Sequence, residues 1–172
     1  MKFKTNNPSI IRIPKINEFS KICRLLNHAD LPYKKFIPDY EPFTVDDLRY
    51  MKNKSKKSFL VIDYCKKLSG LAVWSIKNQK ICWLSILHID PSKQKLGLGT
   101  TLLNKIEKIA QKRNCVYCML ELFPQAYWAK KFYFKNHYHI LPKKQYKKKI
   151  FEDILSTKTK TLVMIKKIKK EG

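Results

Sequence analysis

The stretch HIDPSKQKLGLGTTLLNKIEKIA, residues 88–110, combines the end of an apolar strand, a glycine-containing loop and the start of an amphipathic helix. Within the loop, Gln94, Gly97 and Gly99 form a QxxGxG pattern, and such glycines let backbone N–H groups approach an anion closely. The helix that follows has one apolar stripe at helical spacing, formed by Leu102, Leu103, Ile106, Ile109 and Ala110. Because a helix N-terminus carries the positive end of the helix dipole, this stretch predicts a site for a pyrophosphate group.

Two other glycine motifs are excluded at this loop. A dinucleotide-binding fingerprint needs a third glycine where Leu102 stands. A Walker loop ends in Gly-Lys-Ser/Thr, and that ending is missing. The ligand of this loop is therefore expected to be neither NAD nor ATP.

Upstream of the loop, three apolar, β-branched or aromatic runs cover residues 58–64, 71–76 and 81–90. The connecting segments 65–70 and 77–80 are suited to hairpins. We expect three antiparallel strands in a meander.

The meander is preceded by a predicted strand at 9–13 and by a helix with one apolar stripe: Phe19, Ile22, Cys23, Leu25 and Leu26. Residues 28–43 have no clear periodicity, and we expect a substrate-facing loop there. Thr44 and Asp47 then form a capping box for a second helix, through Met51.

Downstream, alternating elements continue to the end of the chain. The patterns predict a strand at 116–122, a helix at 125–136, and strands at 137–141 and 159–168. The whole is an α/β fold (α+β), which we expect to form a single domain over residues 1–172 with a core at about 9–168.

Composition narrows the class of protein. No segment approaches the roughly 20 apolar residues of a membrane helix, and five cysteines without framework spacing fit a reducing compartment. We therefore expect a cytoplasmic protein without a membrane partner.

The 37 Lys and Arg residues against 13 Asp and Glu give a net charge of +24. This basic balance favours nucleic acid or another anionic partner, with a merely solvated lysine-rich surface as the alternative.

Two segments resemble a known family. Residues 88–110 resemble motif A of the GNAT superfamily of acetyl-CoA-dependent N-acetyltransferases, and AKKFYFKNHY, residues 129–138, resembles its later helix-turn motif. With the order of elements, the resemblance covers residues 10–168. It implies the GNAT fold, a mixed, mostly antiparallel sheet that is splayed between strands 4 and 5 and flanked by helices. It also implies an acyltransferase that uses acetyl-CoA.

The resemblance further implies which residues hold the cofactor. The pantetheine arm would pair with the backbone of the fourth strand, here at Leu87, His88 and Ile89. Loop amides would hold the pyrophosphate, here at Gln94, Lys95, Leu96, Gly97, Leu98, Gly99 and Thr100.

The family's acid that protonates the leaving thiolate falls on Tyr133. A base is also needed, because an amine with a reference pKa of about 10.4 is mostly protonated at neutral pH. The glutamate that serves in the histone-acetyltransferase branch aligns with Trp83, so this carboxylate is missing. Glu121 on the fifth strand is our substitute, and His88 is a further candidate.

The sequence departs from the family pattern in the helix-turn motif. The usual Gly-aromatic pair is His137 and Tyr138 here, and an asparagine often found seven residues before the tyrosine is Ala126. His137 and His139 would share a strand face, but they have no third ligand. We predict no metal.

The acceptor amine has three candidate classes. Residues 141–164 resemble the C-terminal part of histone-acetyltransferase domains, which favours a protein amine, either a lysine or an N-terminus. The charge of +24 would repel polybasic tails and favours an RNA-linked amine, such as aminoacyl-tRNA, or a protein on the ribosome. Small polyamines and aminoglycosides fit less well, because these cations need acidic pockets.

Two hypotheses without catalysis stay open at this point. A non-catalytic acetyl-CoA-binding module would explain the missing strand-four carboxylate. A basic RNA-binding protein without a cofactor would explain the charge, although no known RNA-binding aromatic motif is present.

Overall fold

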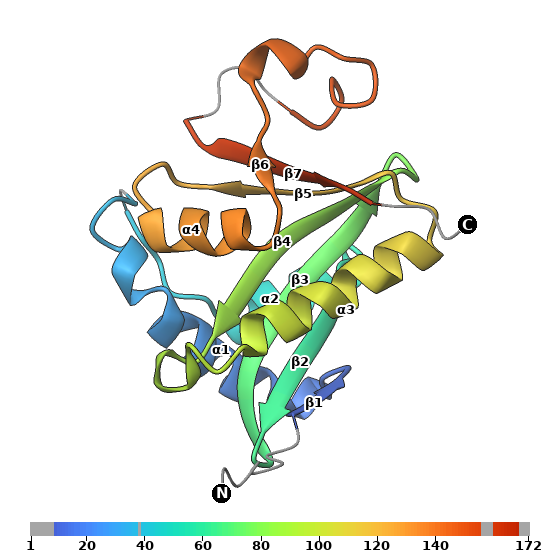
Figure 1. Cartoon of the computed structure of the whole chain (residues 1–172). Helices are drawn as coiled ribbons and strands as arrows, with labels where there is room; N and C mark the ends of the chain where they lie inside the picture. The colour runs from blue at the N-terminus through green and yellow to red at the C-terminus, as the bar shows by residue number, and fades with distance from the viewer. Residues whose placement is uncertain (1–8, 38, 156–159, 169–172) are drawn as a thin grey trace, which may run out of the picture. The chain divides into compact units, whose positions relative to one another are not determined.

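Seven strands form one sheet in the computed structural model, which describes residues 9–37, 39–155 and 160–168 (Figure 1). Their order along the sheet is β1-β2-β3-β4-β5-β7-β6. The strands are β1 (Ser9–Arg12), β2 (Ser58–Tyr64), β3 (Lys67–Lys77), β4 (Ile81–Ile89), β5 (Tyr117–Leu122), β6 (His139–Ile140) and β7 (Leu162–Lys167). β4 and β5 are parallel, and β7 is antiparallel to both β5 and β6. The predicted mixed, mostly antiparallel sheet is confirmed.

Four α-helices accompany these strands in the described residues. They are α1 (Phe19–Ala29), α2 (Val45–Asn53), α3 (Leu98–Lys112) and α4 (Tyr127–Lys135). Short 3-10 turns are η1 (Ile16–Glu18), η2 (Leu31–Tyr33), η3 (Pro91–Lys93) and η4 (Lys143–Gln145). None of the described helices is long and apolar enough to cross a membrane.

The element boundaries follow the predicted ones to within a few residues. The predicted capping box of α2 is present: Asp47 donates its backbone N–H to Thr44 Oγ1 at 3.2 Å, and Asp47 Oδ2 accepts from the Thr44 N–H at 2.8 Å. Residues 1–8 and 169–172 of the predicted domain lie outside the described residues, as does Thr159 at the start of the predicted last strand.

The chain forms two compact units, which we describe separately. The first contains the described residues up to 73 together with 86–103, and the second contains 74–85 together with those from 104 onward. β3, β4 and α3 each contribute residues to both units.

In the first unit, α1 and α2 pack on β2 and β3. The predicted stripe of α1 is buried, and the Phe19 and Phe59 rings stack with centroids 5.8 Å apart. The buried cluster consists of Phe19, Ile22, Cys23, Leu26, Leu48, Phe59, Val61, Leu71 and Val73. Each large apolar side chain buried in this way contributes about 1.5–3 kcal/mol, so this cluster holds the first unit together.

In the second unit, residues 141–155, which follow β6, pack on the strands. Their side chains Tyr146, Phe151 and Leu155 pack with residues from β4, β5 and β7. The buried cluster consists of Ile81, Met119, Leu141, Tyr146, Phe151, Leu155, Val163 and Ile165. A segment that is rich in lysine is thus anchored by apolar residues placed between the lysines.

Both turns of the meander are shorter than predicted. β3 begins at Lys67, so that Cys65 and Lys66 alone connect it to β2, with φ of 51° and 61°. The next turn is Asn78 and Gln79, with φ of 47° and 54°. Two central residues with positive φ are typical of type I′ hairpins, whose twist matches the twist of the strands. The prediction that 65–70 is a connection was therefore wrong, because Leu68 to Gly70 belong to the strand.

Gly70 allows β3 to approach its neighbours closely. A Cβ atom at this position would clash with Ile89 Cδ1, and it would lie 2.9 Å from Ile62 Cγ2 and 3.0 Å from the His88 carbonyl oxygen. Because the last of these atoms is backbone, a side chain here would displace the end of β4.

We expect Gly70→Ala to lower the free energy of unfolding by about 1–3 kcal/mol, because a well-packed core tolerates an added methyl group poorly. Urea unfolding followed by circular dichroism measures this. Ser58→Ala, at the exposed start of β2, is the control and should leave the midpoint unchanged. An equal effect of the two substitutions would contradict the close approach.

Candidate active site

The loop after β4 is built by capping interactions. Asp90 donates its backbone N–H to the Ser69 carbonyl oxygen at 2.9 Å, which fastens the loop to β3. Asp90 Oδ1 accepts from the Ser92 N–H at 2.9 Å and starts η3. Gln94 Nε2 donates to the Ile89 carbonyl oxygen at 3.4 Å. These bonds hold the first half of the predicted phosphate loop against the end of β4.

Gly97 lies directly before α3 and has a φ of 80°. Its carbonyl oxygen accepts the N–H of Thr101 at 3.0 Å, as expected at the start of a helix. A Cβ atom built on Gly97 would meet nothing within 4 Å, so the space beside the backbone is open. The first N–H groups of a helix have no acceptor within the helix, and they point toward this end. The residues thus fit an anion, as the sequence predicts.

The second feature is an unpaired edge of β4. β4 and β5 are in register from Ile81 with Tyr117 to Leu84 with Leu120, and their ladder ends there. All six residues of β5 pair with β7 on its other side. The remainder of β4, with Leu87, His88 and Ile89, lies beyond the ladder with β5. The predicted splay between strands 4 and 5 is confirmed, and among the described residues this part of β4 has no partner strand on the side of β5.

His88 carries a side-chain pair that the sequence did not reveal. Its Nε2 lies 3.0 Å from Oδ1 of Asp30, the buried residue that follows α1. Tyr33 of η2 packs edge-on against the imidazole, with centroids 6.1 Å apart. Asp30 also acts on Tyr40: burial raises the pKa of the Tyr40 phenol, and the Asp30 charge raises it further. The predicted substrate-facing loop thus supplies a carboxylate that orients a histidine of β4.

Tyr133 lies in α4, in the second unit, and is buried. Its ring contacts those of Phe132 and Tyr138, with centroids 5.1 Å and 5.5 Å away. Burial, above all, raises the pKa of Tyr138 far above its ordinary value. Tyr133 and Tyr138 thus lie together among buried aromatic rings of the second unit.

The end of α4 explains one departure from the family pattern. His137 has a φ of 67°, in the left-handed region where glycine is usual. The Tyr138 N–H donates to the Tyr133 carbonyl oxygen, and the His137 N–H donates to the Phe134 carbonyl oxygen, both at 3.0 Å. This is a Schellman motif. Because β6 begins only at His139, the expectation that His137 and His139 share a strand face was wrong.

Glu121 is exposed on β5 and lies opposite Val163 of β7. Its charge adds to the rise in the pKa of Tyr146, which is caused first by burial. Trp83, at the position of the missing carboxylate, packs on the apolar cluster of the second unit. No described contact relates Glu121 to a reacting group.

A comparison with protein-family models identifies the family of this chain. The model of the acetyltransferase (GNAT) family matches residues 23–138, about two thirds of the chain. The chain belongs to the GNAT family. This GNAT protein is therefore an N-acetyltransferase that uses acetyl-CoA and an amine acceptor, as the resemblance implied. No curated protein matches its sequence significantly.

Solved structures agree with the fold of this GNAT protein. Ard1 from Thermoplasma volcanium superposes with a TM-score of 0.69 at 17% identity, and the match covers 94% of this chain and 99% of that one. The ribosomal-protein-S18-alanine N-acetyltransferase from Escherichia coli has a TM-score of 0.71 at 14% identity, with 96% and 97% covered. The PaiA N-acetyltransferase from Thermoplasma acidophilum, in complex with coenzyme A, has a TM-score of 0.68 at 20% identity, with 93% and 99% covered.

In the described residues, no three or more His, Cys, Asp or Glu side chains are grouped so that they could hold a metal ion. Cys82 and Cys118 face each other in the β4–β5 register, and the hydrogen bond between them, with burial, raises the pKa of Cys82 far above its usual range. Burial also raises the pKa of Cys115. Thiols held protonated are poor nucleophiles.

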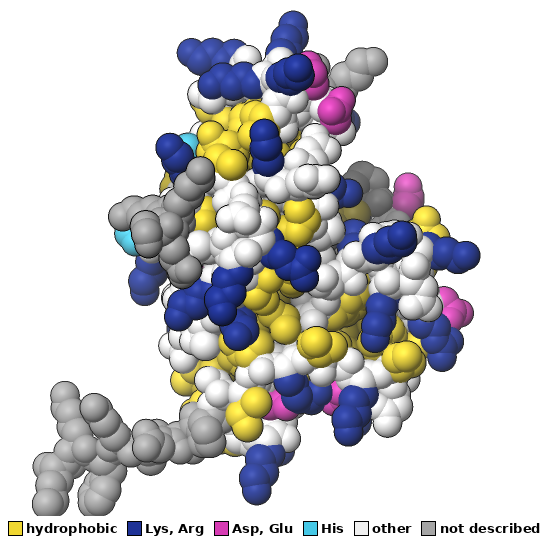
Figure 2. All heavy atoms as spheres, turned by 90° about the vertical axis from the view of Figure 1, so that its right-hand side faces the viewer, with side chains coloured by type: hydrophobic (Ala, Val, Ile, Leu, Met, Phe, Trp, Pro, Cys, Tyr) yellow, Lys and Arg dark blue, Asp and Glu magenta, His cyan; other side chains and the backbone are white. Residues whose placement is uncertain are grey.

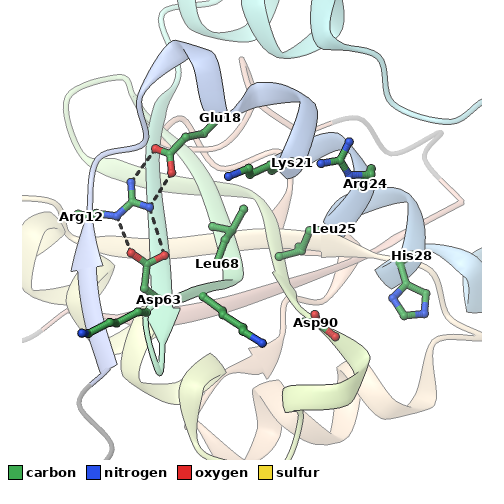
Figure 3. A pocket seen from close by; sticks show the side chains of 11 residues that line it. Arg12, Glu18, Lys21, Arg24, Leu25, His28, Asp63, Leu68 and Asp90 are labelled. Atoms are coloured by element: carbon green, nitrogen blue, oxygen red, sulfur yellow. Dashed lines mark hydrogen bonds and ion pairs between the residues drawn. The ribbon is translucent and has the colours of Figure 1, made fainter.

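A hollow of about 480 Å³ opens elsewhere in the first unit (Figure 3). On one side, Arg12 of β1 lies between two carboxylates. Its Nη1 and Nη2 each donate to Glu18 at 2.7 Å, and its Nε donates to Asp63 at 2.6 Å. Lys21 and Arg24 of α1 line the hollow further along. Sequence reasoning missed this cluster, because residues so far apart in the chain carry no shared pattern.

The Arg12 guanidinium lowers the pKa of Glu18 to about 2, against 4.5 for a free side chain. A lowered folded pKa means that the ion pair stabilises the fold above pH 4.5 and that this contribution is lost as the pH falls toward 2. We expect Glu18→Gln to be less stable than wild type at neutral pH and to lose less stability on acidification.

Thermal unfolding at pH 7, 4 and 2.5 measures this difference. Asp46→Asn is the control, because the Asp46–Arg49 pair of α2 is exposed and contributes little. If Glu18→Gln and wild type lost equal stability between pH 7 and 2.5, the ion pair would not have the predicted role.

Proposed function

We propose that this acetyltransferase binds acetyl-CoA at the Gly97 loop and the free edge of β4 and acetylates a primary amine of a protein, either a lysine or an N-terminus. The observation that carries the proposal is the backbone geometry at the start of α3. There a glycine with positive φ leaves open space beside helix N–H groups, and Lys93 and Lys95 flank the same loop. A pyrophosphate needs these features: close backbone approach and positive charge.

Each residue of the loop has a role in this proposal. The N–H groups from Leu96 to Thr100 would donate to phosphate oxygens, and Gln94 would keep the loop in place through the Ile89 carbonyl oxygen. The backbone of Leu87, His88 and Ile89 would pair with the pantetheine amides, as a β-strand does with a neighbour.

We expect Gly97→Trp to weaken acetyl-CoA binding at least about tenfold, that is by about 1.4 kcal/mol, because the indole would fill the space beside the helix N-terminus. Calorimetric titration measures the affinity, and thermal shift shows that the variant is folded. Tyr50→Trp, on an exposed position of α2, is the control. Undetectable binding of acetyl-CoA to the wild type would refute the proposed function.

The reaction requires two proton transfers by the protein. When bound, acetyl-CoA supplies an acetyl group on a thioester. The neutral amine nitrogen attacks the carbonyl carbon, so that a C–N bond forms and the C–S bond breaks. A base accepts the proton from the amine, and the Tyr133 phenol gives its proton to the departing sulfur. A tyrosine phenol, with a reference pKa of about 10, carries its proton at neutral pH and can give it to the thiolate.

His88 and Glu121 are the two candidate bases. Glu121 has the carboxylate that Trp83 lacks, but it is exposed on β5. His88 lies on the strand that would carry pantetheine, and Asp30 holds its imidazole at 3.0 Å. A base oriented by a carboxylate recurs in many catalytic sites. We therefore place His88 as the base with Asp30 as a positioning residue, and we keep Glu121 as the alternative.

Substitutions separate these bases, since only the true base accepts the proton of the amine. We expect His88→Gln to lower kcat about 100-fold or more, whereas Glu121→Gln should leave kcat unchanged. Asp30→Asn should lower kcat by a smaller factor without abolishing activity, because Asp30 acts only by orienting the imidazole. The reverse pattern would assign the base to Glu121.

The choice of a protein amine rests on two arguments. The segment 141–164 resembles histone-acetyltransferase domains, and solved structures with this fold include an enzyme named for the ribosomal-protein-S18 alanine. The second candidate is an RNA-linked amine, such as that of aminoacyl-tRNA. It is favoured by the net charge of +24, and Figure 2 shows a face on which Lys and Arg far outnumber Asp and Glu. Acceptor screening should therefore include lysine peptides, peptides with free N-termini and aminoacyl-tRNA.

A further inference from the structure

Helix α4 exposes three large aromatic side chains. Tyr127 is 69% exposed, Trp128 is 44% exposed and Phe134 is 47% exposed. Large aromatic residues are usually buried in a monomeric protein, so three of them on nine helical residues require an explanation. The buried side of the helix is taken by Tyr133, and the catalytic role proposed above does not use the three exposed rings.

Lysines lie between these rings on the same face of the helix. At 100° per residue, the positions follow one another around the exposed arc in the order Lys130, Phe134, Tyr127, Lys131, Lys135 and Trp128. Lys130 Nζ lies 4.8 Å from the centre of the Tyr127 ring. Aromatic and cationic side chains are therefore mixed along the face and not separated into two stripes.

The chain around α4 contains no acid. From Phe123 to Phe151 the sequence has eight lysines and neither Asp nor Glu. This segment includes α4, β6 and η4, which follow one another in the second unit (Figure 1). Its exposed lysines after β6 are Lys143, Lys144, Lys147, Lys148 and Lys149. The positive charge of the segment is not neutralised within it.

From this combination we infer that the outer face of α4, formed by Tyr127, Trp128, Lys131, Phe134 and Lys135, is a binding surface for single-stranded RNA. Unpaired bases stack on exposed aromatic rings, and lysines contact the phosphates between them. The face is about 13 Å long at 1.5 Å per helical residue, which suits a few nucleotides. The lysines beyond β6 would add phosphate contacts without reading the sequence.

An anionic membrane would also attract lysines and aromatic rings, but the arrangement on α4 is unsuited to it. A helix that lies on a membrane separates a continuous apolar face from a charged face. Here Lys131 lies between Tyr127 and Trp128 on the wheel, so insertion of the rings would carry an ammonium group into the lipid. Stacked bases alternate with phosphates, and this alternation matches the mixed face.

Fluorescence anisotropy of the full chain with a labelled 12-nucleotide oligo(U) RNA tests the inference. We expect the double variant Tyr127→Ala/Trp128→Ala to bind at least about tenfold more weakly, through the loss of stacking. Lys131→Ala/Lys135→Ala should reduce the slope of log K against log[salt] by about 1.4, because two phosphate contacts are lost at about 0.7 each. Tyr50→Ala, which removes an exposed aromatic ring from α2, is the matched control and should bind as wild type.

Tryptophan fluorescence gives a second readout. Trp74 is buried and Trp83 packs on the apolar cluster of the second unit, whereas Trp128 is exposed. Oligo(U) should quench the emission of the wild type, and Trp128→Phe should lose most of that quenching while it keeps binding.

Binding that all aromatic variants retain, or that Tyr50→Ala loses equally, would overturn the inference. Binding to vesicles containing phosphatidylserine but not to oligo(U) would also overturn it, in favour of a membrane. None of these outcomes depends on acetyl-CoA binding, so the result is separable from the proposed acetyl transfer.

Discussion

The structure depends on the short length over which β4 pairs with β5. The two parallel strands are in register only from Ile81 to Leu84, and β5 is then satisfied on its other side by β7. Unpaired backbone groups at a strand edge usually attract another strand. Here the edge from Ser85 onward leads directly into the Asp90 turn and the start of α3. One strand therefore carries both the edge and the loop at which we propose that acetyl-CoA binds.

Several of the few carboxylates of this basic protein are committed to local structure. Glu18 and Asp63 bracket Arg12, Asp47 caps α2, and Asp90 starts η3. In the second unit, Glu107 accepts a hydrogen bond from Lys166 at 2.6 Å. Carboxylates bonded in this way neutralise little of the positive charge elsewhere in the chain. This distribution leaves a positive electrostatic potential around the lysine-rich segments.

The backbone also adopts strained conformations that a search for sequence patterns does not show. His137 takes the left-handed conformation at the end of α4, and the two meander turns place Cys65, Lys66 and Gln79 at positive φ. Glycine would adopt these conformations more easily. They persist because the surrounding elements hold them: a Schellman motif in one case, and paired strands in the other.

Periodicity alone determined the order of helices and strands, because the stripe of α3 and the runs of β2 to β4 are local properties of the chain. The QxxGxG loop likewise predicted an anion site, since that prediction needs only two glycines and the helix that follows. Only the tertiary structure decided that Asp30 meets His88, that Arg12 meets Asp63, and that Gly70 belongs within a strand. The first two contacts join residues that are 58 and 51 positions apart, and the third depends on close packing, so no local pattern records them. The acid-free run around α4 was readable in the sequence, but the exposure of its rings became visible only once Tyr133 was seen to occupy the buried side.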